Sequence, residues 1–98
     1  MMDLGFKNED YTVQVEEVLG AKFIHCDIHG PWTKTKRQQL QAEFRKWHST
    51  LNEPVYATHY PEQGQKHHKF LALFKFVKLS LAVDAEGRPT EIWARLSL

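Results

Sequence analysis

Apolar and polar residues alternate along residues 11–18 and again along residues 22–29, a pattern typical of half-buried strands. A turn containing glycine at residues 19–21 separates the two stretches, so we expect them to form a hairpin. Residues 79–83 and 90–96 flank a second turn, which contains both glycine and proline. They predict another hairpin at the carboxy-terminal end of the chain.

Two other segments repeat their apolar residues at the spacing of an amphipathic helix. The first helix should be capped by Thr33 or Thr35 and should end near Asn52, before Pro54. The second helix follows a third strand, predicted at residues 55–60 between two prolines. The apolar stripes expected to face the sheet are Leu40, Phe44, Trp47 and Leu51 in the first helix and Phe70, Leu73, Phe74 and Val77 in the second.

The expected order of elements is strand, strand, helix, strand, helix, strand, strand. It predicts an α/β (α+β) fold in which two helices pack on a mixed, mainly antiparallel sheet of five strands. The crossover through the first helix should make the strands at residues 22–29 and 55–60 parallel. A ligand crevice is expected beyond the carboxyl ends of these strands, which places residues 29–37 there. The 98 residues form a single domain, with residues 1–10 expected as a flexible arm and residues 11–96 as the core.

Composition and charge argue against several classes of function. A hydrophobic share of 42% is that of a packed globular protein. The net charge of +1 lacks the basic excess of duplex-DNA binders, so we do not expect a nucleic-acid partner. No stretch approaches the roughly 20 apolar residues that span a membrane, and the lone Cys26 cannot form an internal disulfide. Since the start of the sequence shows no secretory signal pattern, we expect a cytoplasmic protein without a membrane partner.

The spacing of histidine and cysteine residues does not indicate a metal site. In a strand, Cys26 faces away from His25 and His29, and the two histidines lie about 13 Å apart along the strand. That separation is too large for one zinc ion. His67 and His68 are adjacent in a predicted helix and should be solvated. We therefore expect no bound metal.

The start of the first predicted helix carries three cations, Lys34, Lys36 and Arg37. The helix dipole already places positive partial charge there, so each cation costs roughly 0.3–1 kcal/mol unless an anion neutralises it. Replacing all three by alanine should therefore leave the fold intact or stabilise it slightly. Free backbone N–H groups and these side chains form a candidate phosphate cradle, and solvated surface charge is the alternative interpretation. The cradle would consist of Thr33, Lys34, Thr35, Lys36 and Arg37.

Residues 67–76, with the sequence His-His-Lys-Phe-Leu-Ala-Leu-Phe-Lys-Phe, precede a turn at residues 84–87 and the dipeptide Ile92-Trp93. These segments and the order of elements resemble the GNAT family of N-acetyltransferases from the family's second strand onward. They are most similar to the reduced acetyltransferase-like proteins of phages, which include internal virion components. The resemblance covers about residues 11–96 and implies the fold of that family, with acetyl-CoA as the cofactor of an active member.

The sequence departs from this family where the chemistry takes place. Active members hold the CoA pyrophosphate on an Arg/Gln-x-x-Gly-x-Gly/Ala loop, whereas residues 32–36 contain no glycine. Many members use a tyrosine of the following helix as general acid, and here Leu71 takes its place, with Lys75 replacing the usual glycine. An active enzyme would need other residues as its general acid and general base. The candidates are Glu16, Glu17, Asp27 and His29 as general base and Tyr56 and Tyr60 as general acid.

Two functions stay open. The departures favour a GNAT-like protein with a degenerate acetyl-CoA site that acts by binding a host or phage protein, as an inhibitor of a host system or as a virion component. The alternative is an active acetyl-CoA-dependent N-acetyltransferase. The first function implies a location in the host cytoplasm or in the virion. We also expect a homodimer, because such a sheet leaves an edge strand that must be covered.

Overall fold

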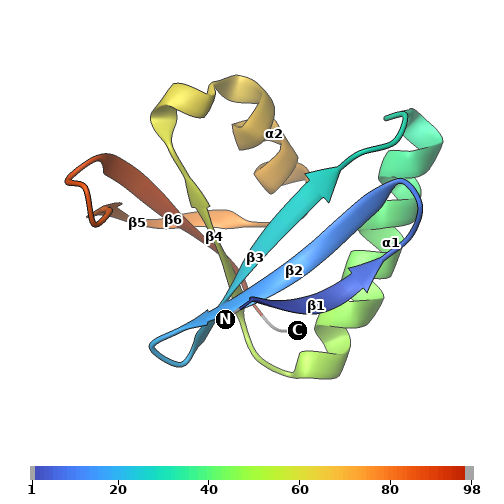
Figure 1. Ribbon diagram of the computed structural model, residues 1–98, viewed down its shortest axis with the longest axis horizontal. Coiled ribbons are helices and arrows are strands. Elements are labelled where there is room, and N and C mark those ends of the chain that lie inside the picture. The colour runs from blue at the N-terminus through green and yellow to red at the C-terminus, as the bar shows by residue number, and fades with distance from the viewer. Residues whose placement is uncertain (1, 97–98) are drawn as a thin grey trace.

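A computed structural model describes residues 2–96 of the chain, apart from the side chain of Gln63 (Figure 1). Over these residues the chain forms six strands, two α-helices and one short 3-10 helix. The strands are β1 (Met2–Lys7), β2 (Tyr11–Val18), β3 (Ala21–Ile28), β4 (Val55–His59), β5 (Val77–Val83) and β6 (Pro89–Arg95). The helices are α1 (Lys34–Leu51), η1 (Pro61–Gln63) and α2 (Gln65–Leu73).

The six strands form one mixed sheet in the order β1-β2-β3-β4-β6-β5. β3 and β4, which precede and follow α1 in the sequence, are parallel to each other. The other neighbouring strands are antiparallel. The α+β class, the mixed and mainly antiparallel sheet, the two helices and the parallel pair are thus confirmed. The predicted count of five strands is wrong, because β1 lies in the segment for which we expected an arm.

β1 joins the sheet through Phe6 and Gly5. Phe6 is partly buried, with its ring centroid 5.6 Å from that of Trp47 in α1. Gly5 lies where the register between β1 and β2 shifts, and a Cβ atom there would come 3.1 Å from the Trp47 ring. The alternation in β1 is short and contains this glycine, so the sequence pattern predicted it poorly.

α1 follows the prediction closely. The Thr33 hydroxyl, and not that of Thr35, caps the helix by accepting a hydrogen bond of 3.2 Å from the Lys36 amide. Asn52 ends the helix in the left-handed conformation. Of the predicted stripe, Leu40 and Phe44 are buried, whereas Trp47 and Leu51 are partly buried against the same core.

α2 ends earlier than its apolar period predicted. The amides of Lys75 and Phe76 donate to the carbonyls of Ala72 and Leu71, both at 3.0 Å, which is the pattern of a Schellman cap. Lys75 adopts a φ of 69°, and this turns Phe76 back into the core. Of the predicted stripe, Phe70 and Phe74 pack inward, Leu73 is exposed, and Val77 belongs to β5.

Both helices cover the same face of the sheet. The residues of β2 and β4 that face them, such as Val13, Val55 and Ala57, are buried. The alternate residues of the central strands point to the opposite side, which no described helix covers. In Figure 1, α1 accordingly lies behind β1 and β2. We call this second side the open sheet face; Phe23, His25, Tyr56, Thr58 and Ile92 lie on it.

Candidate functional site

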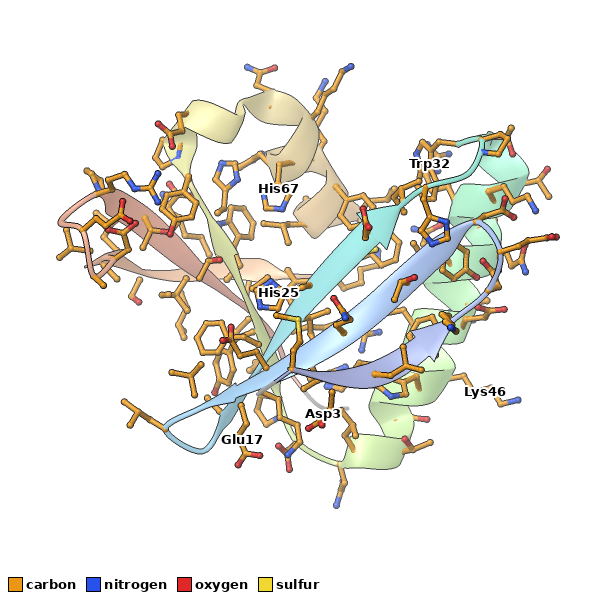
Figure 2. All side chains as sticks on the ribbon, viewed as in Figure 1. Asp3, Glu17, His25, Trp32, Lys46 and His67 are labelled. Carbon is orange, nitrogen blue, oxygen red and sulfur yellow. The ribbon has the colours of Figure 1, made fainter. Side chains whose placement is uncertain are left out.

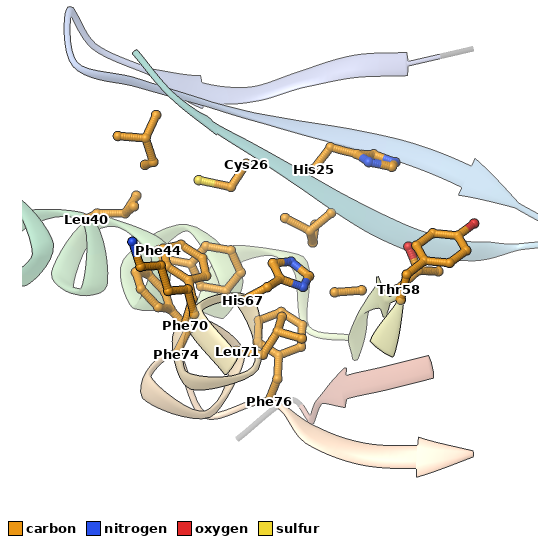
Figure 3. A pocket seen from close by; sticks show the side chains of 15 residues that line it. His25, Cys26, Leu40, Phe44, Thr58, His67, Phe70, Leu71, Phe74 and Phe76 are labelled. Atoms are coloured by element: carbon orange, nitrogen blue, oxygen red, sulfur yellow. The ribbon is translucent and has the colours of Figure 1, made fainter. Parts of the chain in front are cut away.

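A cavity lies where the two parallel strands separate. β3 and β4 are in register at one pair, Phe23 with Tyr56, and diverge beyond it (Figure 1). The cavity has a volume of about 840 Å³. Figure 3 shows β3 on one side of it, with Cys26 and His25, and α2 on the other, with Phe70, Leu71 and His67. The crevice was predicted beyond the carboxyl ends of these strands, at residues 29–37, but none of those residues lines the cavity, which opens between the strands themselves.

Two histidines meet at the wall of this cavity. His59, the last residue of β4, is buried, and His67 of α2 lines the cavity. Their Nδ1 atoms lie 2.7 Å apart, so one ring donates the hydrogen bond and the other accepts it. Burial, and next the charge of His59, lower the pKa of His67. The lowered pKa favours the neutral form of His67 near pH 7, which is the form that can accept a proton.

Sequence analysis did not identify this pair. We expected His67 to be a solvated helix residue, which is wrong, because α2 packs it against His59. One signal was present: His59 continues the alternation of Val55 and Ala57 and so belongs to the buried face of β4. Only the tertiary packing of α2 brings the second histidine to it.

The predicted phosphate cradle already contains an anion from the chain itself. Lys36 Nζ lies 2.5 Å from Asp10 Oδ2, in the turn between β1 and β2. The hydrogen bond to Asp10 raises the pKa of Lys36. Gly30 makes room for this carboxylate, since a Cβ atom at that position would clash with Asp10 Oδ1. The expected dipole penalty of Lys36 is therefore offset within the fold.

The remaining cradle residues lie together at the start of α1 but have different surroundings. The hydroxyl of Thr33 is engaged in the helix cap. Lys34 and Thr35 are exposed, and Arg37 is partly buried. Two of the three cations, Lys34 and Arg37, therefore remain without an ion pair among the described residues.

The candidate catalytic residues Asp27, His29 and Tyr56 do not line the cavity. Asp27 is exposed on the open sheet face, and His29 Nε2 lies 3.0 Å from the Thr12 hydroxyl. The Tyr56 ring packs on Phe23, with the ring centroids 5.6 Å apart. The structure thus places these three residues apart from the histidine pair.

Other polar candidates have partners or are inert. Tyr60 lines the cavity, and its hydroxyl donates to Asp84 at 3.1 Å, which raises the pKa of the tyrosine. Glu16 interacts with His25, with the oxygen and nitrogen 3.1 Å apart.

Although Cys26 is accessible, desolvation and next the charge of Asp27 raise the pKa of its thiol to about 12. This thiol stays protonated at neutral pH and is a poor nucleophile.

Leu71, where the resemblance implies a general acid, is buried in the core. Within residues 2–96, no three side chains of the metal-ligating types gather into a potential metal site. No helix in the same range has the length and apolar character needed to cross a membrane.

Comparison with known proteins gave no match. No protein-family model fits the sequence, and neither a curated protein nor a solved structure matches the chain.

Proposed function

We propose that the chain has a GNAT-like fold with a degenerate acetyl-CoA site and that it acts by binding a host or phage protein. As an inhibitor of a host system it would act in the host cytoplasm, and as a structural component it would reside in the virion. The order of elements, the parallel pair around α1 and the carboxy-terminal hairpin support the resemblance to that family. The start of α1 argues against acyl transfer, and the open sheet face argues for partner binding.

The start of α1 fits a CoA pyrophosphate poorly. Residues 32–36 contain no glycine that would let the backbone approach a phosphate closely. Lys36 is held by Asp10, whose carboxylate would repel a diphosphate. Leu71 cannot donate a proton to a leaving thiolate.

The observation that carries partner binding is the open sheet face. Its centre is apolar and aromatic: Phe23 and Tyr56 are packed ring on ring, and Ile92 lies on the neighbouring strand β6. All three are only partly buried. Figure 2 labels His25, which lies on this face. Aromatic residues are enriched at the centres of protein interfaces, and polar residues at their rims, as Glu16 and Asp27 are here.

A pull-down with matched variants tests the proposal. The wild type, Tyr56→Glu on the open sheet face and Leu19→Glu in the fully exposed β2–β3 turn serve as baits. We expect the wild type and the Leu19 variant to retain the same protein and the Tyr56 variant to lose it. With that protein purified, calorimetry should show affinity at least tenfold weaker for Tyr56→Glu, since a carboxylate would be buried in the interface. Equal binding by all three baits would refute the proposal.

One observation favours the alternative, an active acetyltransferase: His67 lines the cavity between β3 and β4 and is hydrogen-bonded to His59. If the chain transfers acetyl groups, mass spectrometry should detect acetylated lysine peptides with the wild type. The variant His67→Gln should then lose this activity, whereas His68→Gln, on the adjacent residue outside the cavity, should keep it. We expect no transfer by any of the three proteins.

A further inference from the structure

β5 is an edge strand with an unprotected apolar surface. It ends the sheet, where β6 is its only neighbouring strand. Four of its side chains are largely exposed: Val77 at 55%, Leu79 at 58%, Leu81 at 76% and Val83 at 66%. Natural edge strands usually carry charges, prolines or bulges that prevent pairing with another chain. Along β5 the only charge is that of Lys78, next to the bulge at one end.

The opposite edge strand, β1, has the protection that β5 lacks. It carries Asp3 and Lys7, and the bulge at Gly5 interrupts its middle. In β5 the irregularity lies between Lys78 and Ser80, so residues 80–83 remain in regular register with β6. The two edges are therefore not equivalent, and β5 is the one that needs a partner.

The sequence of β5 indicates what that partner is. Residues 79–83 read Leu-Ser-Leu-Ala-Val, with branched apolar residues at both ends and in the middle and small residues between them. The pattern is almost the same in either direction. An antiparallel strand related by a two-fold axis at Leu81 would place Leu79 opposite Val83 and Leu81 opposite Leu81 of the second copy. Apolar side chains would then meet on one face, and Ser80 would meet Ala82 on the other.

Charge does not oppose the same register. Lys78 comes level with Asp84 of the second copy, and each already has a partner in its own chain, Lys78 with Glu91 and Asp84 with Arg88. The turn that begins at Asp84 and the bulge at Leu79, which has no partner in β6, bound the pairing, so its central pairs are Leu81 with Leu81 and Ser80 with Ala82. No other described strand offers an exposed apolar edge with this symmetry.

We infer that β5 pairs antiparallel with β5 of a second copy about a two-fold axis at Leu81, which joins the two sheets into one. This gives the homodimer expected from the sequence a defined interface. The open sheet face remains accessible in such a dimer, so partner binding and self-association use separate surfaces.

Disulfide cross-linking tests the register. Cys26→Ser first removes the native thiol. Directly opposed residues of antiparallel strands have Cα atoms about 4.5–5.5 Å apart, which a disulfide spans. In this background Leu81→Cys should form a covalent dimer under mild oxidation, and an equimolar mixture of Leu79→Cys and Val83→Cys should form a mixed one. Leu19→Cys, in the exposed β2–β3 turn, is the control for random collisions. Cross-linking of Leu81→Cys no faster than that of Leu19→Cys would overturn the inference.

The mass in solution gives an independent readout. Light scattering at roughly 100 μM should give twice the chain mass of 11.5 kDa for the wild type and the chain mass for Leu81→Lys. A monomeric wild type would contradict the inference, and so would a dimer that survives Leu81→Lys. Leu81→Lys should still capture the partner that Tyr56→Glu loses. If instead the wild type is monomeric and Leu81→Lys loses that partner, β5 binds another protein and not a second copy.

Discussion

At the scale of single residues, the buried Arg95 connects both helices to β6. Its Nε donates to the Phe74 carbonyl at 3.0 Å, at the end of α2, and a further hydrogen bond joins its guanidinium to His48 Nδ1 in α1. His48 Nε2 lies 2.7 Å from the Glu53 carbonyl oxygen and therefore carries the proton. The carbonyl groups at a helix end favour a nearby cation, which offsets part of the cost of burying Arg95.

His48 should make stability depend on pH. Burial, opposed by the Glu53 carbonyl and assisted by the charge of Arg95, lowers the pKa of His48 below its ordinary value. Below about pH 6.5 the unfolded chain then binds a proton that the folded chain does not. The free energy of unfolding should thus be constant above about pH 7 and fall as the pH drops toward 5. Urea titrations across this range measure it.

The burial of His67 lowers its pKa too, so His67 adds to the same slope. His67→Gln should therefore reduce the pH dependence without removing it. A free energy of unfolding that does not change between about pH 7 and pH 5 would show that neither histidine is held neutral in the folded state.

Lys75 carries local backbone strain. Its left-handed conformation, with φ at 69°, disfavours any residue with a Cβ atom. Lys75→Gly should therefore raise the free energy of unfolding by about 1 kcal/mol, measured in urea. Lys75→Ala keeps the Cβ atom and is the control, because it should gain much less. Equal stability of the glycine and alanine variants would contradict the assignment of the cap.

At the scale of elements, the start of α1 depends on a contact from the β1–β2 turn. We expected alanine at all three cations to leave the fold intact. The ion pair of Lys36 argues against this, because its loss would leave the mostly buried Asp10 carboxylate without its cation. Lys36→Ala should thus lower the thermal midpoint. Lys34→Ala removes only an exposed cation from the positive end of the helix and should leave the midpoint unchanged or slightly higher.

Differential scanning calorimetry of these two variants, with Asp10→Asn beside them, checks the argument. Asp10→Asn should resemble Lys36→Ala, because each breaks the same pair. If Lys34→Ala were the more destabilising lysine variant, the ion pair would not be what supports the start of α1.

The periodicity of the sequence was sufficient to predict the helices and strands that have long, regular patterns. α1 has a complete apolar stripe and a cap residue, and the alternation of β2 and β3 extends over eight residues in each strand. β1 is short and contains Gly5, so its pattern was too weak to predict. The end of α2 was missed because Lys75 occupies a conformation that sequence rules reserve for glycine.

Of the candidate site, the sequence predicted the cluster of cations at the start of α1, but it placed the crevice at residues 29–37, none of which lines the cavity. It could not predict that Asp10 pairs with Lys36, or that His59 and His67 meet, since both contacts join residues that no local pattern relates. Such contacts depend on how the elements pack, which periodicity does not specify.

At the scale of the whole molecule, the two surfaces that remain uncovered have distinct roles. The helices cover one face of the sheet. We propose that the open sheet face binds a partner and that β5 binds a second copy. The cavity between β3 and β4 borders α1 at Leu40 and Phe44, and none of residues 32–37, where the resemblance places a cofactor, lines it. We propose that no acetyl-CoA chemistry takes place in this region, because the cradle residues fit the pyrophosphate poorly.

Calorimetric titration of the purified protein with acetyl-CoA and with CoA, at moderate salt, tests whether the start of α1 binds the cofactor. Without glycine in the loop and with Lys36 held by Asp10, we predict no saturable heat at millimolar ligand. Saturable binding with a micromolar Kd, weakened when Lys34 and Arg37 are replaced by alanine, would refute the proposed degenerate site and establish the start of α1 as a working pyrophosphate site.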